Sequence, residues 1–443
     1  MPNRRPAVRV AGCFLPGVAM SSTLLTTPPP GPPGSRPGLP AHVRRVVRFT
    51  YAFQFFFGLL VWVPVFYTYQ RAAGLDDRQI FGIQSIYYVV FCLFEIPTGL
   101  VADRLGYRRS LTAGGVVLLA ANLLPIAAPT YPGFLAHWVL IALARSLVSG
   151  AASAYLYEYL QRHGAGEHYQ RAEGNGRAYS LVGKIVCWPA AGLLMSWWPS
   201  SVYWLTALNA LVAVAAALRL PALTGAEPTA GPRATVAATV RIALGQLRRS
   251  PRLALIMVQG VAVFTLARIC QVNLFQPILT GKQTPVAWHG AVLAAMTLFE
   301  VLGSARSHWL RRFVGDLRAV FVLTVAMAAC LALVVPVGAA FTVVCLCGFS
   351  MAAGLAYPVQ RKLLNEAIAD SRYRATLLSI ESIIDRAVCA GVALLLGGYL
   401  AADRLDTFLL LSAGAAIGLM VLLAPLSALV RRRAAADPVA VEG

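Results

Sequence analysis

The sequence FEIPTGLVADRLGYRR, residues 94–109, predicts the end of a membrane helix, because a long apolar run ends here in small residues, one aspartate and three arginines. From about residue 80 to residue 100, only Glu95 carries a charge. A helix of that length rises about 1.5 Å per residue and crosses roughly 30 Å of hydrocarbon. The next apolar run begins at Leu111, so the chain turns straight back into the membrane. Arginines in so short a loop predict that the loop is cytoplasmic.

The composition of the chain is that of a membrane protein. Of its 443 residues, 58% are hydrophobic and 13% are charged, whereas about 25% of an average soluble domain is charged. The formal charge of +20 would indicate nucleic-acid binding in a soluble protein, but most Lys and Arg residues fall in the N-terminal arm, in alternate loops and in the tail. This pattern predicts a multi-pass protein of the cytoplasmic membrane with both termini in the cytoplasm, and no nucleic-acid partner.

Twelve apolar segments follow the N-terminal arm. They lie at about 48–68, 79–101, 110–128, 133–158, 177–198, 201–219, 253–277, 286–306, 317–337, 340–360, 375–402 and 405–430. Only helices satisfy their own backbone groups in lipid at such lengths, so the sequence predicts an all-α membrane protein with twelve transmembrane helices in contact with the bilayer.

Polar stretches divide these segments into domains. Residues 1–44 form a Pro/Gly-rich arm that is predicted to be disordered, and Met20 is an alternative start to Met1. The polar stretch 221–252 is a predicted cytoplasmic linker between two six-helix bundles. The bundles span 45–220 and 253–432, and 433–443 is a cytoplasmic tail.

The loop after the second segment resembles the conserved loop between helices 2 and 3 of the major facilitator superfamily, roughly G-x-L-A-D-R-x-G-R-[KR]. The matching residues are Gly99, Ala102, Asp103, Arg104, Gly106, Arg108 and Arg109. The resemblance implies a major facilitator fold of two six-helix pseudo-repeats. It also implies that Asp103 and the arginines clasp the first half to helix 11, near residues 373–376, when the transporter faces outward. Val101 and Tyr107 depart from the pattern without removing a charge that it needs.

Short internal matches agree with a duplicated architecture. Residues 93–95 (LFE) recur as 298–300 in segment 8, and the pair at 177–178 (RA) recurs as 374–375 at the start of segment 11. Equivalent positions in the two halves are what a parallel repeat requires. The second copy of the loop has His308 where Asp103 stands, so the gating charge pattern is predicted in the first half only.

Segment 4 carries a deeply placed arginine in RSLVSGAASAYLYEYL, residues 145–160. Placing an arginine within the bilayer costs several kcal/mol of free energy unless the side chain forms an ion pair or contacts water. Arg145 is therefore a functional candidate. The segment resembles helix 4 of the superfamily, with Glu158 at its acidic position. The resemblance implies proton coupling or a charge network with Asp103, and an ion pair fixed by packing is the alternative.

Segment 11 places three charged residues near mid-depth. Glu381 and Asp385 are four residues apart and share one helix face. Like charges this close in a medium of low dielectric repel each other, and binding a proton relieves that repulsion, so the pair is a candidate for proton coupling. Arg386 joins this candidate network. The alternative is that Asp385 and Arg386 pair with other charges inside the membrane.

Segments 5 and 7 carry polar side chains that do not suit contact with lipid. Arg268 and Gln271 share one face of segment 7, and Lys184 is similarly deep in segment 5. These three residues are predicted to line a central substrate cavity. Pro189 predicts a kink in segment 5.

The predicted function is secondary active transport of a small organic molecule by alternating access, with protons as the coupling ion and export as the direction, since the helix 2 to 4 pattern resembles the drug-efflux-like branch. An importer or uniporter in the same fold is the first alternative. A polytopic membrane enzyme is the second, but the six histidines are scattered and no nucleotide-binding loop or zinc spacing is present. No cofactor, metal site or enzymatic activity is expected. More mid-depth cations than acids hint at an anionic substrate.

Overall fold

The computed structural model describes residues 39–223, 245, 247, 250–310, 315–368 and 374–436. Within these ranges the side chains of 96–97, 99–105, 308–310, 374–376 and 427–436 are not described. The described part of the chain is helical and has no strand, and its helices belong to one compact unit, Ala41–Gly443. Most of the predicted N-terminal arm and of the predicted linker lies outside the described residues.

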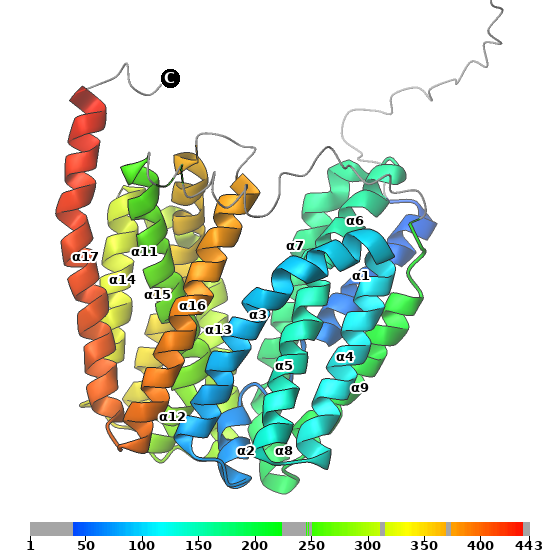
Figure 1. The fold of residues 1–443 in the computed structure, drawn as a ribbon, viewed down its shortest axis with the longest axis horizontal. Helices are drawn as coiled ribbons and strands as arrows, with labels where there is room; N and C mark the ends of the chain where they lie inside the picture. The colour runs from blue at the N-terminus through cyan, green and yellow to red at the C-terminus, as the bar shows by residue number, and fades with distance from the viewer. Residues whose placement is uncertain are drawn as a thin grey trace, which may run out of the picture. The chain divides into compact units, whose positions relative to one another are not determined.

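Each of the twelve predicted segments is largely helical in the structure (Figure 1). The first six contain α1 (Ala41–Gly58), α2 (Phe66–Ala72), α3 (Asp77–Leu105), α4 (Tyr107–Ala127), α5 (Tyr131–Val148), α6 (Ala151–Arg162), α7 (Tyr169–Cys187), α8 (Pro189–Trp197) and α9 (Ser201–Leu218). The last six contain α11 (Pro251–Arg268), a π-helical turn (Ile269–Leu274), α12 (Phe275–Gly281), α13 (Val286–Leu310), α14 (Asp316–Leu333), α15 (Ala339–Ala367), α16 (Arg374–Ala401) and α17 (Leu405–Ala436).

Nine helices of the described part are long and apolar enough to cross a membrane, and α7 with α8 makes a tenth span if the bent pair is counted as one. The first predicted segment, α1 with α2, is not among them, and arginines occupy the first half of α1. The second predicted segment, α3, is not among them either, but the side chains of 96–97 and 99–105 lie outside the described residues to which this count applies. The multi-pass membrane character is therefore clear, whereas composition alone does not establish twelve spans.

The first predicted segment is broken where α1 ends and α2 begins, at residues 59–65. Side chains of α9 satisfy the freed backbone groups: Asn209 donates to the carbonyl of Leu59 at 2.9 Å, and the amide of Val61 donates to the hydroxyl of Thr206 at 3.0 Å. Unwound backbone is tolerated at membrane depth only where protein groups or water satisfy it in this way.

Two further predicted segments are divided. Segment 4 consists of α5 and α6, which meet at Gly150, where φ is +77° and a residue with a Cβ would be strained. Segment 5 bends by 44° between α7 and α8, at Pro189. The predicted proline kink is therefore confirmed. The proline lacks a backbone N–H, so the regular helical hydrogen-bond ladder cannot continue through it.

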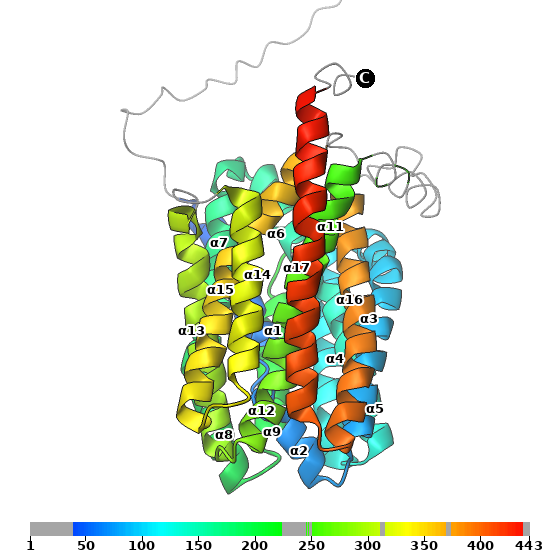
Figure 2. The same cartoon turned by 90° about the vertical axis from the view of Figure 1, so that its left-hand side faces the viewer.

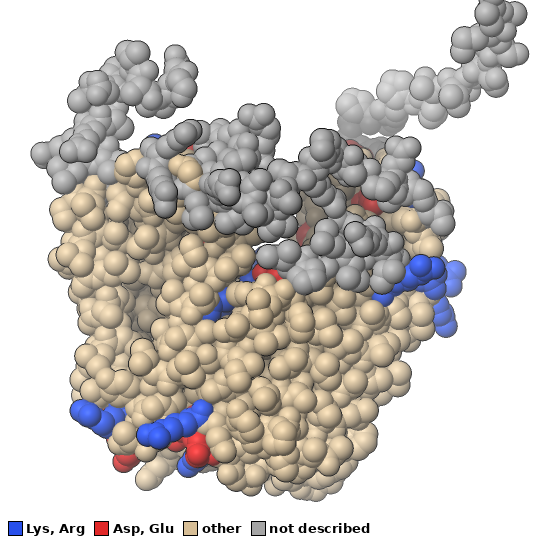
Figure 3. Space-filling view, viewed as in Figure 1, with Lys and Arg blue, Asp and Glu red and all other residues tan. Residues whose placement is uncertain are grey.

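Helices of the first and last six segments pack against each other most extensively at two places. The helix α3 lies along α16, and α8 lies against α13, near the end of the molecule where α2 and α12 also lie (Figures 1 and 2). Glycine permits the second contact: a Cβ on Gly290 would lie 1.9 Å from the carbonyl oxygen of Trp188. The described surface in Figure 3 is mostly uncharged, as lipid contact requires, and its charged side chains lie at the lower and right-hand edges, in a recess near the middle and next to the undescribed residues at the top.

Candidate functional site

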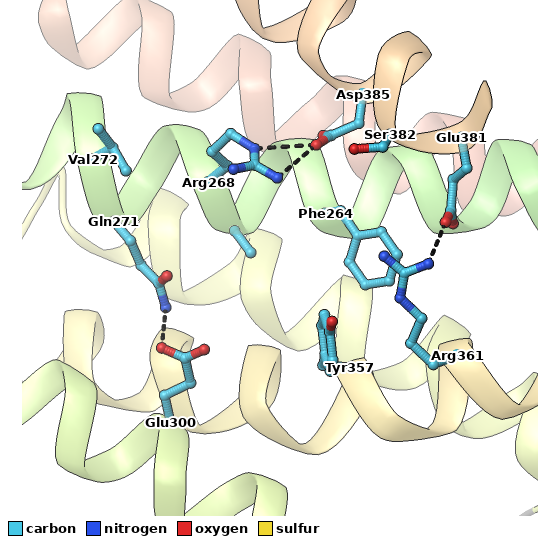
Figure 4. A pocket seen from close by; sticks show the side chains of 11 residues that line it. Phe264, Arg268, Gln271, Val272, Glu300, Tyr357, Arg361, Glu381, Ser382 and Asp385 are labelled. Atoms are coloured by element: carbon cyan, nitrogen blue, oxygen red, sulfur yellow. Dashed lines mark hydrogen bonds and ion pairs between the residues drawn. The ribbon is translucent and has the colours of Figure 1, made fainter. Parts of the chain in front are cut away.

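A polar cavity of about 240 Å³ lies among α11, the π-helical turn, α13, α15 and α16 (Figure 4). It brings together charged side chains that lie far apart in the sequence. The residues that line it are Phe264, Ala267, Arg268, Gln271, Val272, Glu300, Tyr357, Arg361, Glu381, Ser382 and Asp385. Four of them, Arg268, Gln271, Glu381 and Asp385, are residues that the sequence predicted for the cavity or for the coupling network.

The carboxylate of Asp385 is held from both sides. The Arg268 guanidinium approaches one carboxylate oxygen, with Nη2 at 2.8 Å and Nε at 3.1 Å, and the hydroxyl of Thr265 donates to the other at 2.8 Å. The Asp385 side chain is 3% exposed. A charge-assisted hydrogen bond to each oxygen fixes the position of this carboxylate and offsets the cost of removing it from water.

The carboxylate of Glu381 is also buried, but only one of its two oxygens accepts a hydrogen bond from the described residues. Its Oε2 accepts a 2.7 Å bond from Nη1 of Arg361, while Oε1 makes no hydrogen bond with the residues that the structure describes. This oxygen lies over Gly260, whose absent Cβ would be 2.6 Å away. The amide nitrogen Nε2 of Gln360 approaches the same glycine and donates to the carbonyl of Ile256, while the Gln360 side-chain oxygen has no donor among the described residues. A carboxylate oxygen without a donor gains a hydrogen-bonding group when it takes up a proton, because the protonated acid donates.

The sequence reasoning missed Arg361, because the predicted segment ended at residue 360. The helix α15 continues to Ala367, and the Arg361 guanidinium lies 4.9 Å from the ring centre of Phe264 and 5.6 Å from that of Tyr357. Contact with aromatic faces and with Glu381 lets this charge remain deep in the fold. The sequence feature that predicts the longer helix is the stretch QRKLLNEA, residues 360–367, which contains no helix-breaking Gly or Pro.

Glu300, on α13, interacts with a neutral amide and with a more distant ammonium group. Its Oε2 accepts a 3.0 Å hydrogen bond from the amide of Gln271. The ammonium of Lys184, on α7, interacts electrostatically with both Glu300 and Arg145, and it lies 5.7 Å from the ring centre of Trp188. Neither Lys184 nor Arg145 forms an ion pair within the described part of the chain. Among the described residues, these two cations of the first six segments therefore have no carboxylate in direct contact, although Glu300 attracts Lys184 from a longer distance.

Arg386 joins α16 to α3. Its Nη1 lies 2.8 Å from Oε2 of Glu95 and donates a 2.9 Å bond to the hydroxyl of Ser382. The guanidinium also lies 4.0 Å from the ring centre of Phe91. The pair links residues 291 positions apart. The Glu95–Arg386 pair corresponds to the alternative interpretation of segment 11, in which Arg386 pairs with another charge of the membrane-spanning part.

Other predicted site residues lie elsewhere. Glu158 forms an ion pair with Arg162, one turn along α6, and so has a local partner. Gly106 has a φ of +85°, which suits glycine at the junction of α3 and α4. The Arg108 guanidinium donates a 2.8 Å bond to the carbonyl of Leu218, at the end of α9, and Arg109 is exposed.

The clasp between Asp103 and helix 11 falls outside the described side chains. The backbone of α3 is helical through Gly99, Asp103 and Arg104, but their side chains are not described. The same holds for residues 374–376 of α16, and 373 is outside the described residues altogether. Within the described residues, no group of three or more His, Cys, Asp or Glu side chains could hold a metal ion.

Helices that span a membrane and enclose a cavity of buried, paired charges define the class of membrane transporters. A sequence profile of the Major Facilitator Superfamily matches residues 47–384. The chain belongs to this superfamily.

Sequence relatives are distant. An uncharacterized MFS-type transporter of Mycobacterium tuberculosis, present in two strains, is 28% identical over 151 residues, which are 33% of this chain and 34% of the relative. The match thus spans about a third of that relative's length.

Similar solved structures cover most of the chain. The nucleoside transporter NupG aligns with a TM-score of 0.73 at 14% identity, over 87% of this chain and 98% of NupG. A POT family transporter in complex with 5-aminolevulinic acid aligns with a TM-score of 0.68 at 12% identity, over 88% of this chain and 96% of that protein. These likenesses establish a transporter fold.

Proposed function

We propose that this protein is a proton-coupled exporter of a small organic molecule, working by alternating access in the cytoplasmic membrane with both termini in the cytoplasm. The observation that carries the proposal is the unsatisfied carboxylate oxygen of Glu381 in a polar cavity of a major facilitator protein. Such a group can gain a hydrogen bond by taking up a proton, and that gain is what a coupling site needs.

Glu381 is a better proton carrier than Asp385. Both oxygens of Asp385 already accept hydrogen bonds, and a proton there would weaken its ion pair with Arg268. A proton on Oε1 of Glu381 would leave the bond from Arg361 to the other oxygen in place. We therefore assign proton binding to Glu381 and the fixing of cavity geometry to Asp385 with Arg268.

The substrate is proposed to carry an anionic group. The acids of the cavity accept hydrogen bonds from Arg268, Arg361 and Gln271, whereas neither Lys184 nor Arg145 forms a direct ion pair with an acid among the described residues. A carboxylate or phosphate on the substrate would supply that missing charge.

Export is the proposed direction because the helix 2 to 4 pattern resembles the drug-efflux-like branch. The arginine-rich loop at 103–109 supports the proposed orientation, and Asp103 at its start is proposed to close the cytoplasmic side against helix 11. Import or uniport in the same fold would need the same cavity. Transport measured in oriented vesicles distinguishes these modes from export.

The test is transport into inverted membrane vesicles with an imposed pH gradient, screening organic anions against hydrophobic cations. Wild type is compared with Glu381→Gln, Asp385→Asn and the control Glu366→Gln, which changes an exposed carboxylate on α15 in the same way. We expect Glu381→Gln to lose gradient-driven accumulation at least about tenfold, equivalent to about 1.4 kcal/mol of coupling free energy, and to retain exchange of substrate across the membrane.

Asp385→Asn should slow both accumulation and exchange, since it frees the Arg268 guanidinium, while Glu366→Gln should behave as wild type. Transport that does not depend on the proton gradient would contradict the assignment of proton coupling and favour a uniporter. Uptake only in right-side-out vesicles would favour an importer. Selective movement of cations would refute the proposed anionic substrate.

A further inference from the structure

A second, larger cavity of about 670 Å³ lies between α11, α16 and α17, outside the polar site. Figure 2 shows α17 beside α11 and α16, and the face drawn in Figure 3 is hollowed beside α17. We call this cavity the α17 groove. Its lining is aliphatic and aromatic except for the hydroxyls of Thr265, Tyr399 and Ser412. A cavity with so few hydrogen-bonding groups does not hold ordered water.

The α17 groove opens towards the bilayer. Its rim carries exposed apolar side chains, among them Val258, Leu395 and Leu411, which are 45%, 60% and 53% exposed. In a membrane protein such side chains face lipid hydrocarbon. The residues that line the groove run from Ala254 to Leu274 along α11 and its π-helical turn, on the order of 30 Å at 1.5 Å per residue, which is comparable to the hydrocarbon thickness of a bilayer.

One end of the groove is marked by positive charge. Arg252 is exposed at the second residue of α11, two positions before groove-lining Ala254. The helix α17 ends at the same end of the molecule at which α11 begins (Figure 2), and its sequence contains three arginines at 431–433. Basic residues next to a membrane span attract anionic headgroups, by about 1 kcal/mol for each Lys or Arg near the surface.

One hydrogen bond connects the lining of the groove to the lining of the polar cavity. Thr265 lines the groove, and its hydroxyl donates the 2.8 Å bond to Asp385, which lines the polar cavity with Arg268. An occupant that packs against Thr265 therefore contacts the residue that fixes this carboxylate.

We propose that one acyl chain of an anionic phospholipid occupies the α17 groove, with its headgroup near Arg252 and its tail against Thr265. The bound tail restricts the Thr265 side chain and so stabilises the arrangement of Asp385 and Arg268. The protein accordingly depends on an anionic lipid for full stability and transport. This inference requires only that the chain spans a membrane, and it stands whether or not transport is coupled to protons.

The test is native mass spectrometry of the purified full-length protein in detergent, titrated with phosphatidylglycerol or phosphatidylcholine. Val258→Trp fills the groove. Val325→Trp is the matched control, because Val325 is 39% exposed on α14 and does not line the groove. We expect wild type and Val325→Trp to retain one phosphatidylglycerol, and Val258→Trp to bind it at least about tenfold more weakly. Arg252→Gln should reduce the preference for phosphatidylglycerol over phosphatidylcholine.

Ala415→Phe, which fills the groove from the α17 side, provides a second variant in case Val258→Trp does not fold. Phosphatidylglycerol should raise the thermal unfolding midpoint of wild type and of Val325→Trp, but not of the groove-filling variants. Equal retention of lipid by the two tryptophan variants would overturn the proposed site. Equal affinity of wild type for the two phospholipids would overturn the role of the anionic headgroup.

Discussion

Arg268 and Asp385 form an ion pair in which one partner is 37% exposed to the cavity and the other is 3% exposed. Removing either partner leaves a charge in a poorly solvated site, and that loss costs more than the pair itself contributes. The sequence predicted Arg268 for the substrate cavity and Asp385 for the coupling network, because each is a polar residue in an otherwise apolar segment. It assigned them different roles, since nothing in a single sequence indicates which charges meet.

The first prediction concerns this pair. Asp385→Leu alone and Arg268→Met alone should each lower the free energy of unfolding by roughly 1–3 kcal/mol, a range reduced for the partial exposure of Arg268. The double variant should be at least as stable as either single variant, because no unpaired charge remains. Thermal unfolding midpoints in detergent micelles measure this. If the two losses simply add, the side chains are not energetically coupled.

Several elements differ in length from the apolar segments that predicted them. The hydropathy pattern predicted that α15 ends at residue 360, but the helix continues to Ala367. It continues because Arg361 and Lys362 form ion pairs with Glu381 and Asp316. The predicted fourth segment is two helices, because Gly150 adopts a φ of +77° between α5 and α6. Hydropathy reports burial in lipid and carries no information about either feature.

The second prediction concerns the junction of α5 and α6. Gly150→Ala should lower the free energy of unfolding by about 1–2 kcal/mol, because a residue with a Cβ is strained at positive φ. Gly174→Ala is the control, since Gly174 lies within α7, has no positive φ and has open space around its Cα. Alanine there should be neutral or stabilising by up to about 1 kcal/mol. Equal thermal shifts in both variants would refute the strained junction.

At the scale of the whole molecule, the first and last six segments meet through α3 with α16 and α8 with α13. The ion pair of Glu95 with Arg386 crosses the first contact, and the close approach at Gly290 defines the second. Alternating access requires such contacts to form and separate during the cycle. The division into bundles at 45–220 and 253–432 stays a prediction, as does membership of the drug-efflux-like branch.

The third prediction concerns the contact of α8 with α13. Gly290→Ala should lower the free energy of unfolding by about 1–3 kcal/mol, because the new Cβ would overlap the backbone carbonyl of Trp188. Gly414→Ala, on α17, meets no atom within 4 Å and should leave stability unchanged. Unfolding midpoints and initial transport rates of both variants test this. A Gly290→Ala variant with wild-type stability would show that the two helices separate at no cost.

Hydrophobic run length, the positions of arginine and the loop at 99–109 were sufficient to predict an all-helical transporter of the major facilitator superfamily, because the bilayer imposes strict rules on helix length and charge. The candidate residues Glu381 and Asp385 followed from helical spacing alone. Their partners did not: Arg361 lies 20 residues from Glu381, and Arg268 lies 117 residues from Asp385. Pairing depends on how helices pack, so only the folded molecule distinguishes the satisfied carboxylate from the one with a free oxygen.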